Sequence, residues 1–441
     1  MPRLADAREF VDDLAAFVTA SPSSYHAVRE SARRLREAGF SELREEDDWQ
    51  IEPGSRVFVV RDGSIIAAAV PTGAGPTTPL TIFGAHTDSP SLKLKPKSST
   101  SAAGFSQVGV EVYGGALLNS FLDRDLALAG RIVLADGTVR LVRTGPYLRV
   151  PQLAIHLDRQ VNSEGLKLDP QRHLQPITGL AADEHDVLAD LAARAEDPVT
   201  GETAPVEPAD IAGYDIVTAD TQAPAVIGAR EELFASGRLD NLLSTHAGVR
   251  AMIDAEPADH IAVFVSNDHE EVGSATRSGA AGPFLEDVLV RLHLALGGDE
   301  ASRRRAFAGS LLVSSDVGHS VHPNYAERHD PANLPVAGGG PILKINANQR
   351  YATDGRGAAA WAAACAAAGV TSQEFVSNNA MPCGSTIGPI TATRLGFLTV
   401  DVGVPILSMH SLREMTAVTD PHDLFLAAKS LLTETAIRSV H

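Results

Sequence analysis

The stretch LTIFGAHTDSP, residues 80–90, carries the clearest indication of the fold. Its apolar first part predicts a buried strand that ends at His86, and further polar residues follow directly after it. The same order of apolar run and polar cluster recurs in HIAVFVSNDHEEVGS (260–274), LLVSSDVGHS (311–320) and PILSMHS (405–411). Because parallel strands end at one edge of an open sheet, these clusters predict an α/β fold with a site at that edge.

Helical patterns alternate with these strands. Apolar residues at helical spacing predict two opening helices at 6–20 and 24–38, and later helices near 241–254, 284–297, 357–368 and 422–438. An Asp62-Gly63 pair between two apolar runs predicts a hairpin shortly before residue 80. We therefore expect an α/β fold with a mixed, largely parallel sheet flanked by helices.

The middle of the chain differs from its two ends in composition and in hydrophobic pattern. From about residue 92 to 230 it is rich in Ser, Gly and Pro, and it holds short alternating runs such as RIVLADGTVRLVRT (131–144) with an Asp136-Gly137 turn. This pattern is typical of a β-rich domain. We expect one α/β domain built from residues 1–91 and 236–441, interrupted by an inserted β-rich domain of residues 92–235.

Composition limits the possible partners. The 441 residues carry a formal net charge of −18, with a pI near 5.2. Nucleic-acid and anionic-membrane surfaces need clustered Lys and Arg, so neither is an expected partner.

Cys365 and Cys383 are the only cysteines and lack zinc-thiolate spacing, so a metal would have to use His, Asp and Glu. We find no secretory signal and no membrane-length apolar run, and we expect a cytoplasmic protein.

The polar clusters offer the ligands of a two-metal site. Two ions about 3.5–4 Å apart need a bridging carboxylate and about two further ligands each, and zinc takes imidazole nitrogen and carboxylate oxygen. His86 and Asp316 could hold one ion and Glu271 and His410 the other. Asp240, in GRLDNLLS (237–244), could bridge both, although an Asp before a helix is more often only a cap.

Glu270 and Asp88 have the positions expected of supporting groups. Adjacent side chains in extended backbone diverge, so Glu270 could act as general base while Glu271 binds a metal. Asp88, two residues after His86, could orient that imidazole. Each residue alone has a plainer interpretation, since paired glutamates and single histidines are usually solvated. Residue spacing also leaves rival ligands open: His269, His319 and His322.

Several longer motifs resemble one family. They are HTDSP with LKLKP, LDNLLS, NDHEEVGS, DVGHSVHPNY, KINANQRYATD, MPCGSTIGP and MHSLREM, in this order between residue 84 and about 415. Together they look like the aspartyl aminopeptidase family of dinuclear zinc exopeptidases. In GGALLNSFLDRDLALAG (114–130), small Ala, Leu and Asn residues stand where that family has Trp and His.

The resemblance implies a zinc exopeptidase-like catalytic domain, an inserted oligomerisation domain and a role for each site residue. The implied metal ligands are His86, Asp240, Glu271, Asp316 and His410, with Asp240 bridging, Glu270 as base and Asp88 behind His86. His319 and Lys344 would line the pocket for the first side chain of the substrate. His156, in PQLAIHLDR, would reach the active site of a neighbouring subunit and stabilise the oxyanion.

We therefore expect a metal-dependent aminopeptidase that removes acidic residues, Asp or Glu, from short peptides. The expected cofactors are two divalent ions per subunit, with zinc first, although Mn²⁺ and Co²⁺ tolerate the same ligands. The resemblance also implies a homo-oligomer, in the family a tetrahedral dodecamer. The alternatives are an aminopeptidase for neutral or apolar residues and a non-catalytic scaffold of the same fold.

Overall fold

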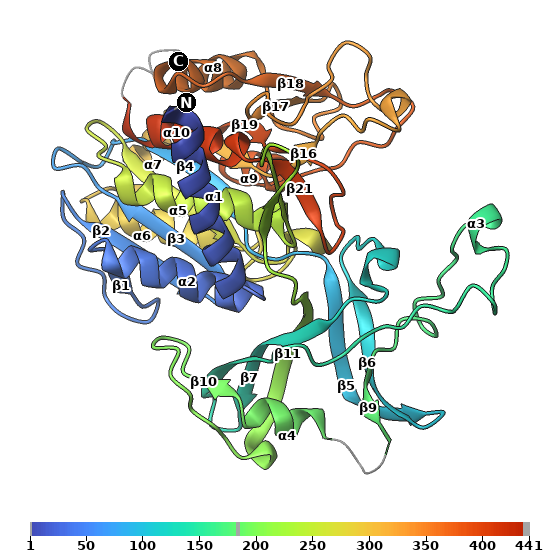
Figure 1. The fold of residues 1–441 in the computed structure, drawn as a ribbon. Coiled ribbons are helices and arrows are strands. Elements are labelled where there is room, and N and C mark those ends of the chain that lie inside the picture. Colours follow the sequence, from blue (N-terminus) through green and yellow to red (C-terminus); the bar gives the residue numbers. More distant parts are fainter. Residues whose placement is uncertain (1, 182–185, 435–441) are drawn as a thin grey trace.

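The computed structural model describes residues 2–181 and 186–434, and its largest element is a nine-stranded sheet (Figure 1). In spatial order its strands are β1 (Ser41–Leu43), β2 (Arg56–Arg61), β3 (Ser64–Ala69), β14 (Ile261–Asn267), β4 (Leu80–His86), β15 (Leu311–Ser315), β19 (Leu398–Gly403), β17 (Ile342–Ile345) and β18 (Gln373–Val376). The central strands β14, β4, β15 and β19 run parallel, whereas β3 and β17 pair with them antiparallel. The predicted mixed, largely parallel sheet is confirmed.

Helices cover both faces of this sheet because its strands are apolar on both sides. Along β4, Phe83 and Ala85 join the core on one face, and Leu80 and Ile82 join the core on the other. The first core includes residues of α1 (Pro2–Ala20), α2 (Ser24–Glu37), α5 (Leu239–Asp254), α8 (Gly355–Ala368) and α10 (Thr419–Thr433). The second includes residues of α6 (Phe284–Ala295) and α7 (Glu300–Ala308).

Four of the described α-helices were not predicted: two short ones in the middle of the chain, Val161–Glu164 and Val187–Ala192, and two, α7 and α9 (Ile387–Leu395), that flank the large sheet. α7 begins with a capping box between Asp299 and Ser302, but its EASRRRAFA sequence has too few apolar residues to show a helical pattern. α9 contains Pro389, which is tolerated in the first turn because proline lacks an N–H and the N–H groups of a first turn have no partner within the helix. The predicted closing helix ends at Thr433, and its predicted part from residue 435 to 438 lies outside the described residues.

We call residues 92–235 the inserted segment. It lies in the chain between β4 of the large sheet and helix α5. This segment forms a seven-stranded antiparallel sheet, of which only the first residue, Ser91, precedes it. Its strands in spatial order are β10 (Ala195–Glu196), β8 (Val139–Arg143), β7 (Leu126–Leu134), β11 (Ile211–Asp220), β5 (Ser91–Ala102), β6 (Phe105–Tyr113) and β9 (Ile177–Leu180). The Asp136-Gly137 turn joins β7 to β8 as predicted. Apolar side chains such as Leu128 and Ile216 form a separate core.

Short elements complete the fold. β12 (Ala225–Ile227), β13 (Leu233–Ser236) and β21 (Glu414–Ala417) form a three-stranded sheet, and β16 (Gly318–His319) pairs with β20 (Pro405–Ile406). The inserted segment also contains α3 (Val161–Glu164) and α4 (Val187–Ala192). Figure 1 shows the part around α3 projecting away from both large sheets.

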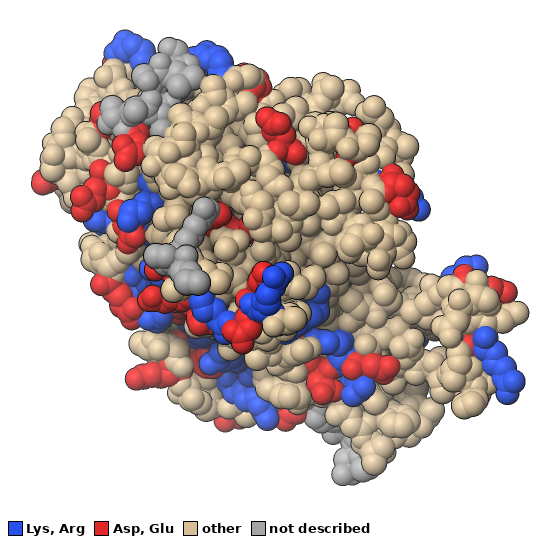
Figure 2. Space-filling model, turned by 45° about the horizontal axis from the view of Figure 1, so that its top comes forward, with Lys and Arg blue, Asp and Glu red and all other residues tan. Residues whose placement is uncertain are grey.

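The surface mixes charges of both signs. On the face drawn in Figure 2, Lys and Arg side chains are interspersed with Asp and Glu side chains. Within residues 2–181 and 186–434, none of the helices is both long and apolar enough to cross a lipid bilayer.

Candidate metal centre

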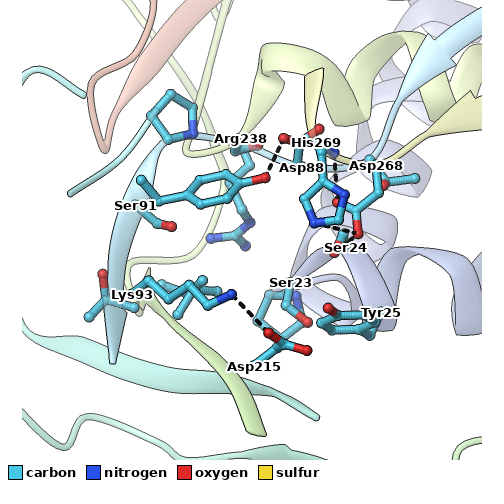
Figure 3. A pocket seen from close by; sticks show the side chains of 18 of the residues that line it. Ser23, Ser24, Tyr25, Asp88, Ser91, Lys93, Asp215, Arg238, Asp268 and His269 are labelled. Carbon is cyan, nitrogen blue, oxygen red and sulfur yellow. Dashed lines mark hydrogen bonds and ion pairs between the residues drawn. The ribbon is translucent and has the colours of Figure 1, made fainter. Parts of the chain in front are cut away.

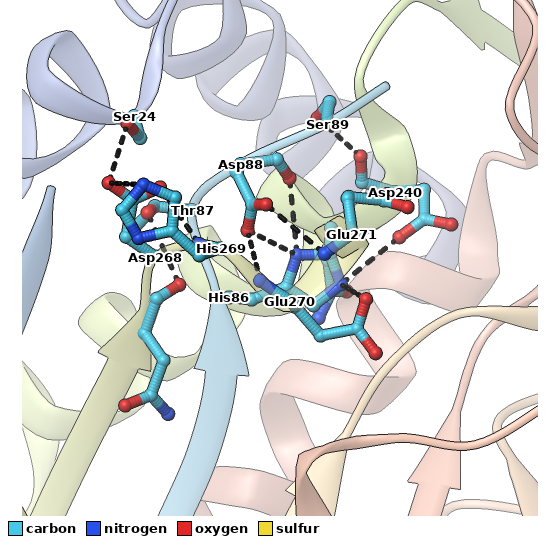
Figure 4. A network of polar contacts seen from close by, with 12 residues as sticks. Ser24, His86, Thr87, Asp88, Ser89, Asp240, Asp268, His269, Glu270 and Glu271 are labelled. Atoms are coloured by element: carbon cyan, nitrogen blue, oxygen red, sulfur yellow. Dashed lines mark hydrogen bonds and ion pairs between the residues drawn. The ribbon is translucent and has the colours of Figure 1, made fainter. Parts of the chain in front are cut away.

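The parallel strands bring their polar ends together at one edge of the large sheet. His86 closes β4 and lies directly opposite Asn267, the last residue of β14. Asp316 follows β15, which pairs with the other side of β4. The turn after β14 places Glu270 and Glu271 beside the same edge (Figure 4). The predicted convergence of strand-end clusters is therefore observed.

Asp240 lies between two imidazoles. Its Oδ1 is 3.3 Å from His86 Nε2, and its Oδ2 is 3.3 Å from His410 Nε2. His86 Nε2 is also 3.4 Å from Asp316 Oδ1, and His410 Nε2 is 3.5 Å from Glu271 Oε2. The five predicted ligands thus form two clusters that share Asp240, with the ligand atoms of each within 4.8 Å of one another.

The helix-capping interpretation of Asp240 does not hold. The N-cap position of α5 is Arg238, so Asp240 is the second residue of the helix, and its two carboxylate oxygens lie against His86 and His410. Asp240 and Asn241 instead depart from helical backbone geometry within the first turn. The main-chain oxygen of Asp240 accepts a hydrogen bond from Ser89 Oγ at 2.6 Å. The carboxylate is therefore held toward the two imidazoles.

The unpaired atoms of the cluster fit a cation. Asp240 Oδ1, Glu271 Oε1 and Asp316 Oδ1 are buried and have no hydrogen-bond partner among the described residues. Buried carboxylate oxygens without partners are costly, and coordination of a cation removes that cost. Imidazole nitrogen and carboxylate oxygen are also the donor atoms that zinc prefers when thiolates are absent. The residues present therefore suit divalent metal ions.

The titration behaviour of the cluster indicates uncompensated negative charge. Burial, together with the carboxylates of Asp316 and Asp240, raises the pKa of Glu270 to about 7. Burial alone would lower the pKa of His410, but Asp240 raises it to about 9. Such shifts mean that the site binds protons strongly. Divalent cations would neutralise the same negative charge.

Asp88 links the cluster to the turn that follows β14. Its Oδ1 accepts a hydrogen bond from Glu270 N at 3.0 Å, and its Oδ2 accepts one from Glu271 N at 3.2 Å. His86 Nδ1 lies 3.1 Å from the main-chain oxygen of Asp88 and 3.4 Å from its Oδ1. Asp88 therefore contacts the imidazole that it was predicted to orient.

The backbone at Glu270 differs from the prediction. Glu270–Val272 is a short 3-10 helix rather than extended chain, and His269 and Gly273 on either side have positive φ. Side chains in a 3-10 helix still point about 120° apart. Glu271 consequently faces His410, whereas Glu270 Oε2 lies 4.0 Å from His86 Nε2.

The rival histidines lie elsewhere. His269 Nδ1 contacts Thr276 Oγ1 at 2.9 Å, and His322 packs against the ring of Tyr325. Among the described residues, neither belongs to a metal-binding group, and His319 does not either. His319 instead lines an adjacent hollow of about 320 Å³ with Arg328, His329 and Phe375.

Lys344 and His156 have contrasting surroundings. The side chain of Lys344 is buried, and its Nζ donates to Val317 O at 2.8 Å and lies 3.5 Å from Asp316 Oδ2. His156 is exposed and lies a few residues before α3, in the part of the inserted segment that projects from the body (Figure 1). Within one chain, the structure does not bring His156 to the metal cluster.

Sequence reasoning missed Glu414. Its Oε2 accepts a hydrogen bond from Asp240 N at 3.0 Å, and its Oε1 accepts one from His410 N at 2.9 Å. Glu414 is almost fully buried. It lies in the motif MHSLREM, so its position four residues after His410 was the available signal, but the partnership with Asp240 depends on tertiary structure.

Comparison with known proteins agrees with this geometry. Residues 17–431 match the model of a family described as aminopeptidase I zinc metalloprotease (M18). A Streptomyces avermitilis protein named "Probable M18 family aminopeptidase 2" is 54% identical over 430 residues, covering 96% of this chain and 97% of that protein. A Ricinus communis protein named "Probable aspartyl aminopeptidase" is 40% identical over 453 residues, covering 92% of each chain.

Solved structures give the same result. A chain in a cryo-EM structure of the Ape4 and Nbr1 complex has a TM-score of 0.92 and 38% identity, covering 97% of this chain and 86% of that one. The mApe1 dodecamer of S. cerevisiae has a TM-score of 0.83 and 27% identity, covering 100% of this chain and 98% of that one. The chain therefore belongs to the M18 family of zinc metallo-aminopeptidases, as its motifs predicted.

Proposed function

We propose that this chain binds two divalent metal ions and releases acidic residues, Asp or Glu, from the N-termini of short peptides. The observation that carries the proposal is the position of Asp240, each of whose carboxylate oxygens faces a different imidazole. One carboxylate between two clusters of ligands is what a pair of closely spaced ions requires. His86 and Asp316 would hold one ion, and Glu271 and His410 the other.

Glu270 would be the general base. Bound divalent ions polarise the scissile carbonyl and make an attacking water more acidic. Glu270 would take the proton from that water and return it to the leaving amine. Its Oε2 lies 4.0 Å from His86 Nε2, so the carboxylate faces the ligand cluster, where a general base must lie within hydrogen-bond reach of the attacking water. Asp88 would hold the Glu270 turn and His86 in place through the contacts described above.

Glu270→Gln tests this role. We expect kcat to fall roughly 10²- to 10⁴-fold, because the amide cannot accept the proton of the water. Zinc content per chain, measured on the same sample, is expected to stay at the wild-type value. Wild-type-like hydrolysis by this variant would exclude Glu270 as base, and an inactive wild-type protein would leave only a scaffold role.

Lys344 and His319 would provide the acidic selectivity. A net charge of −18 repels acidic substrates at long range, so selectivity needs a local positive group. The buried ammonium of Lys344 lies beside the predicted ligand Asp316, and its charge is poorly screened there. The name of the Ricinus communis relative, a probable aspartyl aminopeptidase, supports the same preference.

Lys344→Met tests the selectivity while keeping most of the side-chain volume. We expect kcat/KM for an Asp-anilide to fall roughly 30-fold more than for an Ala-anilide, which corresponds to about 2 kcal/mol of lost charge pairing. Lys429→Ala, which removes a half-exposed lysine paired with Asp254, is the control. Equal losses on both substrates would remove Lys344 from this role, and faster cleavage of a Leu-anilide by the wild type would favour a neutral or apolar preference.

We also propose that residues 1–91 and 236–441 form the catalytic domain and that residues 92–235 form a domain for self-association. The projecting part of the inserted segment has exposed apolar side chains on either side of His156, with Ile155 47% exposed and Leu157 74% exposed. Such side chains favour burial against another surface. The dodecamer formed by S. cerevisiae mApe1 supports a homo-oligomer here. His156 would then enter the active site of a neighbouring subunit.

A further inference from the structure

The residues that leave β6 connect the inserted segment directly to the metal cluster. Tyr113, the last residue of β6, donates a hydrogen bond from its hydroxyl to Asp88 Oδ2 at 2.7 Å. Two residues later, the main-chain oxygen of Gly115 accepts a hydrogen bond from His410 Nδ1 at 3.0 Å. One short stretch of the inserted segment therefore contacts groups on both sides of the cluster.

The two glycines allow this close approach. A Cβ on Gly114 would lie 3.0 Å from Glu271 Cβ, and Gly114 has a φ of +72°. A Cβ on Gly115 would lie 3.2 Å from His410 Nδ1 and 3.5 Å from its Cε1. Contacts of 3.0 and 3.2 Å are tighter than a Cβ atom normally makes, so a side chain at either glycine would displace Glu271 or His410. The main-chain N–H of Leu117 also donates to His410 O at 3.0 Å.

Tyr113 also lines a small cavity. Its ring borders a cavity of about 50 Å³ that lies between the inserted segment and α2. Figure 3 shows this cavity between Ser91 and Lys93 on one side and Ser24, Asp88 and Asp268 on the other.

We infer that Tyr113 and the Gly114–Gly115 peptide are positioning elements of the metal centre. Gly115 O accepts a hydrogen bond from the Nδ1–H of His410, which leaves Nε2 as the free ligand atom toward Asp240 and Glu271. Tyr113 fixes the carboxylate of Asp88, which in turn holds His86 and the turn at Glu270. This inference rests on the proposed metal site.

The consequence is that the inserted segment contributes to metal affinity although it supplies none of the predicted ligands. Its attachment near the metal centre is strengthened by Arg131, whose guanidinium lies 2.8 Å from Asp62 Oδ1 and 3.0 Å from Asp215 Oδ2. Arg131 also stacks on the ring of Tyr25. Asp62 and Tyr25 belong to the part of the chain before residue 92, so these contacts bridge the two parts.

Zinc affinity of the full-length chain tests the inference. We expect Tyr113→Phe and Gly115→Ala each to raise the zinc dissociation constant roughly tenfold, measured on metal-depleted protein by competition with a chromophoric chelator. Tyr147→Phe is the matched control, because Tyr147 also donates to an aspartate of the inserted segment, Asp190, at 2.6 Å. We expect its zinc affinity to equal that of the wild type.

The outcomes are distinguishable. Wild-type zinc affinity in both Tyr113→Phe and Gly115→Ala would overturn the positioning role alone. If Gly115→Ala fails to fold, Tyr113→Phe decides, since it removes one hydroxyl and adds no bulk. A His86→Ala variant that binds two zinc ions as tightly as the wild type would overturn the proposed metal site itself. Thermal unfolding of the zinc-free variants separates lost stability from lost metal binding.

Discussion

Glu414 is a single residue that joins two of the predicted ligands through their main chains. Its two carboxylate oxygens accept hydrogen bonds from the N–H groups of Asp240 and His410, which come from distant parts of the sequence. A buried carboxylate between two N–H donors holds both peptides at a fixed separation. The spacing of Asp240 and His410, and with it the spacing of the two proposed ions, thus depends on a residue outside the predicted ligand set.

Glu414→Gln tests this dependence. A glutamine can accept from one N–H, but its own NH₂ group would face the other donor. We expect zinc affinity to fall roughly tenfold, together with a loss of about 1–3 kcal/mol in the free energy of unfolding of the metal-free chain. Chelator competition measures the zinc affinity, and urea unfolding measures the free energy of unfolding.

Asp420→Asn is the control for Glu414→Gln. Asp420 is also fully buried, and it accepts hydrogen bonds from the N–H groups of Gly338 and Gly340. Its substitution should alter stability and leave zinc affinity unchanged. Equal zinc affinities of Glu414→Gln and Asp420→Asn would mean that Glu414 has only a structural role.

Among the elements, α1, α2 and α5 meet around one aspartate. Asp13 of α1 lies 2.8 Å from His246 Nε2 and 2.7 Å from Arg250 Nη1, both on α5, and 2.8 Å from Arg34 Nη1 on α2. His246 Nδ1 is buried without a hydrogen-bond partner among the described residues. A neutral imidazole that donates only from Nε2 satisfies this geometry, whereas a protonated ring would bury an unpaired N–H.

This arrangement predicts a loss of stability in mild acid. Burial, assisted by the charges of Arg34 and Arg250, outweighs Asp13 and lowers the pKa of His246 to about 4. Between the unfolded value near 6.5 and pH 4, the unfolded chain binds the proton and the folded chain does not, so stability falls as the pH falls through this window. We expect a loss of about 3 kcal/mol from this group, complete near pH 4.

His246→Gln is expected to remove most of that slope, since an amide does not titrate. Urea unfolding at pH 7 and pH 4.5, with chelator present so that metal release does not contribute, measures it. His173→Gln, which removes an exposed imidazole of the inserted segment, is the comparison. An unchanged slope in His246→Gln would show that other groups cause the acid sensitivity.

The secondary-structure elements also show which features could be predicted from the sequence and which could not. The meeting of His86 with Asp316 was predictable, because both follow apolar strands and such strands end together at one sheet edge. The helix α7 was not, because its helical state depends on a capping box and on Ala306 and Phe307 reaching the core. The contacts of Tyr113 and Glu414 were not either, since they join residues whose proximity only the folded chain creates.

At the scale of the whole molecule, two separate sheets contribute residues to the candidate metal centre and its surroundings. The large sheet provides the strand ends, and the inserted segment provides the contacts of Tyr113 and Gly115. The part of the same segment around α3 projects away from the body of the chain (Figure 1), and His156 lies a few residues before α3. Each active site would depend on two subunits if the inserted segment positions residues in its own chain and also extends toward another chain.

Mixing two inactive variants tests this dependence. If His156 acts in a neighbouring subunit, His156→Ala and Glu270→Gln each inactivate, but a mixed oligomer contains sites with an intact Glu270 from one chain and an intact His156 from the other. Random reassembly of equal amounts should restore about one quarter of wild-type kcat, because one pairing in four has both residues. Mass spectrometry of differently tagged chains verifies that subunits have exchanged. If activity then stays at the level of the separate variants, His156 does not act in the neighbouring site.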